Sequence, residues 1–157
     1  MAIEIERKFL LKENILPPFE NGTLYVQGYL DENPEKTIRV RITGTKAFLT
    51  IKGKTTGYSK SEYEYEIPIK DAEELLLLCK NEPIRKTRYI IYYGSHRWDV
   101  DVFHEQNDGL ILAEIELESE NEPFDMPPWI GKEVTQDFRY YNAYLSGKPY
   151  QFWEVDK

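Results

Sequence analysis

Charged residues recur at every second position in many parts of this sequence, and most of these rows carry a single sign. The acidic rows are Glu4-x-Glu6, Glu62-x-Glu64-x-Glu66, Asp99-x-Asp101 and Glu114-x-Glu116-x-Glu118, and the basic rows are Arg39-x-Arg41 and Lys86-x-Arg88. Because residues two apart share one face of an extended strand, a Glu-x-Glu pair directs two carboxylates into one space, where divalent cations such as Mg²⁺ bind. Arginine and lysine supply the donors that match phosphate oxygens. Together these groups suit phosphoryl transfer, which depends mainly on positioning and charge neutralisation.

The charge of the whole chain points away from an anionic ligand. Among 157 residues, 28 are Asp or Glu and 20 are Lys or Arg, which gives a formal net charge of −8 and disfavours nucleic acid as a partner. With Lys8 and Lys52 included, the rows hold six basic and ten acidic side chains, a sum of −4. Two divalent cations would neutralise that sum, so binding of an anionic substrate is expected to need metal.

Eight segments rich in β-branched and aromatic residues are expected to be the strands that position these rows. They lie near Ala2–Leu10, Thr23–Leu30, Thr37–Thr43, Ala47–Gly53, Lys60–Ile69, Arg85–Tyr93, His96–His104 and Leu110–Glu118. Short connections with Gly, Pro, Asn or Asp separate them and predict antiparallel neighbours, because a parallel crossover needs a dozen or more residues.

Three helical segments complete the pattern. Asp71 is placed as the N-cap of a helix whose leucines at 75–78 face the core and which ends near Asn81 and Pro83. A helical turn is expected near Trp129–Lys132 and a second helix over Asp137–Leu145. Without repeats or linkers, the chain is interpreted as one domain over residues 1–157.

Seven of the eight expected strands carry a charged stripe and an apolar stripe, and two architectures fit this pattern. A sandwich or barrel can bury the apolar stripes and expose the charges to water. That arrangement is favoured because a buried charge costs several kcal/mol unless it is paired or binds an ion. Alternatively, the sheet closes with the charges inside and the apolar stripes covered by helices and loops. Separation by sign favours this second architecture, since solvated faces usually mix signs.

The rows also occur in the order typical of one protein family. Glu4-Ile-Glu6-Arg-Lys8 matches an ExExK signature. The match continues through Gln27-Gly-Tyr-Leu, Arg39-x-Arg41, Thr50-x-Lys52, Glu62-x-Glu64, Lys86-x-Arg88, Trp98-x-x-Asp101, Ala113-Glu-Ile-Glu-Leu, Gly131-Lys-Glu-Val-Thr and Tyr140-Tyr-Asn. On these motifs the chain resembles the CYTH superfamily, also called triphosphate tunnel metalloenzymes. The resemblance implies a mainly β fold with a few flanking helices (α+β), built as an eight-stranded antiparallel closed barrel, or tunnel, with a charged interior.

The resemblance also implies roles for individual residues. Metal, either Mg²⁺ or Mn²⁺ and expected as two ions, would be held by Glu4, Glu6, Glu114, Glu116 and Asp101. Phosphates would be bound by Lys8, Arg39, Arg41, Lys52 and Arg88, with Lys132 as a gate at one end. For hydrolysis, Glu62 or Glu64 would orient the attacking water, and Lys86 would act as an acid or an electrostatic clamp. Tyr29 lies on a strand without charges of its own, and its phenol is expected to face the tunnel and pair with a lysine.

The expected reaction is hydrolysis of inorganic tripolyphosphate to pyrophosphate and phosphate, because the chain has no evident extra lobe for a large organic group. The alternatives are a class IV-type adenylate cyclase, a nucleoside or thiamine triphosphatase, and a barrel that only binds polyphosphate. The single cysteine, Cys79, the charged N-terminus and the lack of a long apolar run predict a cytoplasmic location, with no membrane partner. A homodimer is compatible with the sequence, which does not fix the oligomeric state.

Overall fold

A computed structural model describes residues 3–153 of the chain, about half of which form strands. The strands are β1 (Ile3–Leu11), β2 (Thr23–Asn33), β3 (Lys36–Thr43), β4 (Lys46–Gly53), β5 (Ser59–Ile67), β6 (Ile84–Tyr93), β7 (His96–Phe103), β8 (Ile111–Glu116) and β9 (Ile130–Glu133). The helices are α1 (Ile69–Leu78) and α2 (Asn142–Gly147), with single 3₁₀ turns at Glu105–Asn107, Phe138–Tyr140 and Tyr150–Phe152. The eight predicted strands are confirmed over the described residues; Ala2 lies outside them.

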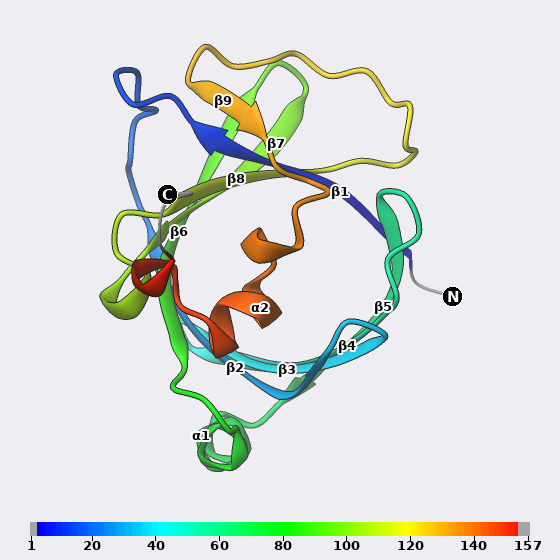
Figure 1. Ribbon diagram of the computed structural model, residues 1–157, viewed down its shortest axis with the longest axis vertical. Coiled ribbons are helices and arrows are strands. Elements are labelled where there is room, and N and C mark those ends of the chain that lie inside the picture. Colours follow the sequence, from blue (N-terminus) through cyan, green and yellow to red (C-terminus); the bar gives the residue numbers. More distant parts are fainter. Residues whose placement is uncertain (1–2, 154–157) are drawn as a thin grey trace.

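Eight of the strands close into a ring. Their order is β5-β4-β3-β2-β6-β7-β8-β1, all neighbours are antiparallel, and β1 pairs again with β5 through Glu4 opposite Lys60. Figure 1 looks along the axis of this ring, with the 138–147 segment (orange) inside its outline. The predicted tunnel fold is therefore confirmed, and a closed ring leaves few unpaired strand edges.

The apolar stripes of β1, β3, β4, β7 and β8 lie outside the ring under a cover. Val40 and Ala47 of β3 and β4 pack against Ala72 of α1. Trp98 of β7 packs with Trp129 of the segment that runs into β9. Burial of these side chains supplies the hydrophobic stabilisation that a charged interior cannot. Of the two architectures compatible with the sequence, the structure adopts the one with charges inside.

The segment after β9 closes one end of the ring with an apolar plug. Phe103 and Leu112, which point into the ring beyond the charged rows, pack against Tyr140, Leu145 and Trp153. Figure 1 shows α2 inside the outline of the ring, and its first residues, Asn142 and Ala143, line the interior cavity. The C-terminal part of the chain can thus contribute side chains to the interior.

Three helical predictions are corrected. Trp129–Lys132 is not a helical turn, because Ile130–Glu133 pairs with the free edge of β1 as β9. The helix expected over Asp137–Leu145 is split by the extended backbone of Tyr141, at ψ 135°, into a 3₁₀ turn and α2. Helix α1 begins at Ile69 after Pro68, whose φ of −60° suits a helix start, so Asp71 lies in the first turn and is not the cap.

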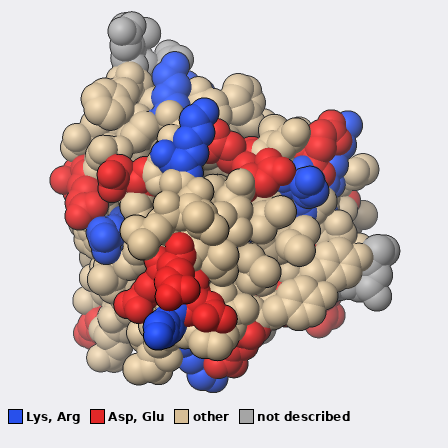
Figure 2. Space-filling model, turned by 90° about the horizontal axis from the view of Figure 1, so that it is seen from below, with Lys and Arg blue, Asp and Glu red and all other residues tan. Residues whose placement is uncertain are grey.

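The outer surface differs from the interior in how its charges are distributed. On the face around α1 shown in Figure 2, acidic side chains form several small groups with Lys or Arg beside them. Within residues 3–153 the structure contains no helix with the length and apolar character needed to cross a membrane.

Candidate active site

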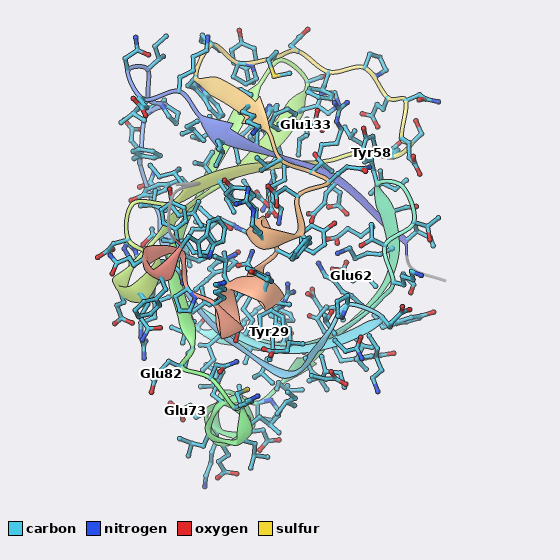
Figure 3. All side chains as sticks on the ribbon, in the orientation of Figure 1. Tyr29, Tyr58, Glu62, Glu73, Glu82 and Glu133 are labelled. Carbon is cyan, nitrogen blue, oxygen red and sulfur yellow. The ribbon has the colours of Figure 1, made fainter. Side chains whose placement is uncertain are left out.

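A cavity of about 950 Å³ occupies the ring, and the charged rows line it. The predicted site residues on its wall are Glu4, Glu6, Lys8, Tyr29, Arg39, Arg41, Lys52, Glu62, Glu64, Lys86, Arg88, Glu114 and Glu116. Figure 3 shows Tyr29 and Glu62 on the inner side of the ring, whereas Glu73 and Glu82 lie outside it near α1. Two of the predicted site residues, Asp101 and Lys132, do not line this cavity.

Strand register decides which charges meet across the wall. Lys8 lies opposite Glu114, and Glu6 lies opposite Glu116, on the β1–β8 ladder. On the β4–β5 ladder, Lys52 lies opposite Glu62. Directly opposed residues share a face of the sheet and lie close together, so opposite charges stabilise the pair and like charges destabilise it. The Glu6–Glu116 pair is therefore an unfavourable contact that the fold retains.

Lys86 and Arg88 of β6 are held by one carboxylate that is buried and does not line the cavity. Asp101 of β7 receives two bonds from Arg88, from Nε at 2.7 Å and Nη2 at 2.9 Å, and lies 2.8 Å from Nζ of Lys86. Lys86 and Asp101 are each 1% exposed. Despite the burial of its carboxyl, Arg88 and Lys86 hold the pKa of Asp101 well below its usual range. Asp101 thus positions two cations, and its placement does not favour the metal-ligand role.

A chain of neutral amides connects this cluster to β3 and α2. Nε of Arg41 donates to Oε1 of Gln27 at 2.8 Å, and Nε2 of Gln27 donates to Oδ1 of Asn142 at 3.2 Å. The same Asn142 oxygen accepts from Nζ of Lys86 at 2.9 Å. Sequence reasoning gave no role to Gln27 or Asn142, although both stand in the quoted motifs. Because both side chains are uncharged, the charge pattern of the sequence does not single them out; Asn142 lines the cavity and Gln27 is fully buried.

In the basic wall, formed by Arg39, Arg41, Lys86 and Arg88, the charged forms of Lys86 and Arg41 are disfavoured. Burial, together with Arg88 and Arg41, lowers the pKa of Lys86 to about 7 against the opposing effect of Asp101. Burial and the neighbouring Arg39 and Arg88 also lower the pKa of Arg41. A group whose charged form is disfavoured by like charges is stabilised when an anion arrives. This wall is therefore suited to serve as an anion subsite.

An unpaired donor marks the same subsite. Arg39 is 7% exposed, and its Nη2 bonds Thr50 at 3.1 Å and Glu64 at 3.5 Å. Its Nε has no partner among the described residues. A buried donor left without an acceptor costs free energy, and a phosphate oxygen would satisfy it.

In the acidic wall, formed by Glu4, Glu6, Glu114 and Glu116, the charged forms of two carboxyl groups are disfavoured instead. Burial, followed by Glu114 and Glu4, raises the pKa of Glu6 to about 7. Burial and then Glu4, Glu62 and Glu6 also raise the pKa of Glu116. Among the described residues, neither carboxylate has an ion-pair or hydrogen-bond partner, whereas Glu4 lies 2.8 Å from Lys52 and Glu114 lies 3.1 Å from Lys8. Crowded, unpaired carboxylates are stabilised by a cation, so this wall is suited to serve as a cation subsite.

The donor set fits a hard divalent metal. Within residues 3–153, no three acidic, His or Cys side chains are already assembled as a closed metal cluster. Mg²⁺ usually binds through one or two carboxylates, several waters and substrate phosphates and needs no such cage. Glu6 and Glu116 supply unpaired carboxylates, and Glu4 and Glu114 lie beside them.

Tyr29 and Lys132 have surroundings that differ from those expected. The hydroxyl of Tyr29 accepts a bond from Gln27 at 3.1 Å, and no lysine among the described residues donates to it. Lys132 is exposed on β9 and lines a second cavity with Tyr58 and Glu133. Phe138 borders both cavities, so Lys132 lies near the first cavity without facing it.

Lys60 is a cavity-lining cation that sequence reasoning missed. In the sequence it marks only the start of an expected strand. The phase of β5 identifies it, because Lys60, Glu62 and Glu64 alternate on one face.

Comparisons with known proteins agree with this geometry. A family model described as CYTH domain matches residues 2–144. An inorganic triphosphatase of Acetivibrio thermocellus is 45% identical over 152 residues, covering 96% of this chain and 97% of that protein. An inorganic triphosphatase of Nitrosomonas europaea is 36% identical over 151 residues, covering 91% of this chain and 96% of that protein. A crystal structure of an inorganic triphosphatase matches with a TM-score of 0.66 at 36% identity, covering 93% of this chain and 95% of the other.

Proposed function

Because the chain belongs to the CYTH domain family, we propose that it hydrolyses inorganic triphosphate, as the names of its two relatives state for them. One observation carries the proposal: among the residues that the structure describes, the unpaired Nε of Arg39 lies on one wall of the cavity and the unpaired carboxylates of Glu6 and Glu116 lie on the other. A free anion would suit only one wall and a free cation only the other. A metal-bound polyphosphate suits both.

The basic wall binds the phosphate chain. Arg39 offers its unpaired Nε, and Arg41 and Arg88 present guanidinium groups fixed by Gln27 and Asp101. Lys8 and Lys52 extend this positive lining toward the acidic wall, where each has a carboxylate partner. Fixed donors stabilise charge on the transferring phosphoryl group without reorganising during the reaction.

The metal would be Mg²⁺ or Mn²⁺, as two ions, and Glu4, Glu6, Glu114 and Glu116 would hold it. When bound, it would withdraw charge from the phosphate oxygens and neutralise the acidic wall. Asp101 is not among these ligands, because Lys86 and Arg88 occupy its carboxylate.

Hydrolysis joins a water oxygen to the terminal phosphorus and breaks the bond from that phosphorus to the bridging oxygen. Glu62 or Glu64 orients the water and takes its proton. Lys86 donates a proton to the bridging oxygen as it leaves with pyrophosphate, a role that suits an amine with a pKa near 7. Tyr29 shapes the cavity wall and holds Gln27 in place.

The test is phosphate release from tripolyphosphate, ATP, thiamine triphosphate and pyrophosphate with Mg²⁺, Mn²⁺ or a chelator. We expect tripolyphosphate to be the preferred substrate and the chelator to abolish turnover. Cyclic AMP as the main product from ATP would favour a cyclase, and preference for an organic triphosphate would favour a nucleoside or thiamine triphosphatase. Tight binding without turnover would identify a binding protein.

Asn142→Ala is expected to lower kcat/KM about fivefold, since the hydrogen bond that Lys86 loses is worth roughly 1 kcal/mol. The bond from Nζ of Lys86 favours the ammonium form, so its loss should also lower the pKa of Lys86. The high-pH limb of the kcat/KM profile should then move to lower pH.

Asn142→Asp is the matched control. Its carboxylate would favour the Lys86 ammonium and move the same limb to higher pH. If both variants leave the limb in place, Asn142 does not position Lys86.

A further inference from the structure

Lys60 of β5 projects into the cavity at the seam where the ring closes. It lies opposite Glu4 on the β1–β5 ladder and on the same face of β5 as Glu62. Its side chain is half-buried and lines the cavity. It therefore lies where the acidic wall begins, next to the Lys52 that pairs with Glu4.

Lys60 differs from the other buried or half-buried lysines of the wall in having no carboxylate partner. Lys8 lies 3.1 Å from Glu114, Lys52 lies 2.8 Å from Glu4, and Lys86 lies 2.8 Å from Asp101. Among the described residues, the Lys60 ammonium has no ion pair or hydrogen bond. Its Nζ instead lies 4.9 Å from the centre of the Tyr141 ring.

Tyr141 is contacted by two lysines of the wall. Nζ of Lys8 lies 5.4 Å from the centre of the same ring, and the Tyr141 hydroxyl donates to the carbonyl of Thr135 at 3.4 Å. A cation over an aromatic face is held more weakly than one paired with an anion. Lys60 can therefore leave the ring for a phosphate oxygen, while the hydroxyl keeps Tyr141 in place.

The charges around Lys60 also favour arrival of an anion. Burial and the nearby Lys52 and Lys8 lower the pKa of Lys60, opposed by Glu6 and Glu4. Those two carboxylates belong to the proposed cation subsite, where bound metal would neutralise them. Lys60 would then face two lysines and the metal without compensating negative charge. An anionic ligand would supply that charge.

We propose that Lys60 is a further substrate-binding residue that contacts the triphosphate at the β1–β5 seam. This proposal rests on the function proposed above for the same cavity. It extends the phosphate-binding surface from β1, β3, β4 and β6 to β5. Lys60 rests on Tyr141 in the free protein and turns to the phosphate chain when substrate binds.

The experiment compares Lys60→Met, Lys60→Arg and the wild type with Mg²⁺ and tripolyphosphate. Methionine keeps the apolar stem against Tyr141 and removes the charge, so KM should rise about tenfold with kcat changed less than threefold. Arginine restores the charge and should bring KM back to within about threefold. Lys70→Met removes an exposed lysine of α1 and should leave both constants unchanged.

Binding of tripolyphosphate by calorimetry separates this inference from the proposed function. If the wild type binds but does not hydrolyse, hydrolysis is refuted, and weaker binding by Lys60→Met still supports the contact. An unchanged KM and binding constant in Lys60→Met would overturn the inference. So would a lowered thermal midpoint with unaltered binding, which identifies the Tyr141 contact as purely structural.

Discussion

Lys86→Met should lower kcat for triphosphate hydrolysis about a thousandfold, because general acid catalysis is worth roughly 10²–10⁴-fold. The side chain is 1% exposed, and methionine is unbranched and one atom shorter, so it keeps the stem without the charge. Asp101 keeps both bonds from Arg88, so the buried carboxylate retains a cation partner. Circular dichroism should therefore match the wild type while steady-state turnover falls.

Lys86→Arg separates proton donation from charge stabilisation. A guanidinium stays protonated at any working pH and cannot serve as an acid near neutrality. We expect this variant to recover KM while kcat stays at least a hundredfold low. Near-normal turnover in Lys86→Arg would show instead that the group only clamps charge.

The pH dependence follows from the lowered pKa of Lys86. Donation requires the ammonium, so kcat/KM, which reports the free enzyme, should decline as pH rises through about 7. Bound phosphate favours the charged amine, so the decline of kcat itself should come at higher pH. Initial rates measured from pH 5.5 to 9.5 would place both limbs.

Local sequence patterns predict the strands and their charged faces but not which face is inside. Alternation places Arg39 and Arg41 together whether the ring encloses them or exposes them, since both arrangements share the period of two. The charged face points inward because segments distant in sequence cover the apolar face: α1 packs over Val40, and the segment that runs into β9 packs over Trp98. Before the structure, only the resemblance to a known family decided between the two.

The observed site differs from the predicted one for two reasons: a residue can lie too deep along the ring to reach the cavity, and segments distant in sequence can enter it. Asp101 has the correct phase, but its position opposite Arg88 and Leu112 places it below the wall, toward the plug. Asn142 reaches Lys86 only because the plug brings α2 into the ring, and β9 forms because β1 offers an edge. Such contacts have no local sequence signal.

Glu6→Gln should lower turnover at least a hundredfold and also stabilise the metal-free protein at pH 8. Both effects have one cause: the carboxylate opposes Glu116 and lies near Glu114 and Glu4 without a partner among the described residues. The amide keeps the shape of the side chain and removes its negative charge. The cation subsite would then lose a ligand, which lowers turnover. The metal-free fold would lose the repulsion between Glu6 and the neighbouring carboxylates, which raises its stability.

The sign of the pH effect follows from the pKa of Glu6, which folding raises to about 7. A raised carboxyl pKa contributes stability below about pH 4.5, where the group is protonated in both states, and that contribution is lost as pH rises through about 7. Above pH 7 the ionised folded state carries a penalty on the order of 1–3 kcal/mol. Urea unfolding in chelator should therefore give a higher free energy of unfolding for Glu6→Gln than for the wild type at pH 8, but not at pH 4.5.

Glu133→Gln is the matched control, because the surroundings of Glu133 lower the pKa of its carboxyl, whereas those of Glu6 raise it. Oε1 of Glu133 lies 2.6 Å from Nη2 of Arg7, and the bond from Arg7 lowers the pKa of Glu133. That substitution should lower stability at pH 8 and leave turnover unchanged. If Glu6→Gln also lowers stability at pH 8, the acidic wall does not carry the repulsion inferred from it.

Divalent cation should reverse the order of stability. A ligand that binds only the folded state stabilises it, and Mg²⁺ would bind the wild type more tightly than a variant lacking one carboxylate. Added Mg²⁺ should thus raise the unfolding midpoint of the wild type more than that of Glu6→Gln. Part of the net charge of −8 is then a cation requirement, because the acidic wall lowers the stability of the metal-free protein by holding carboxylates whose charge bound metal would neutralise.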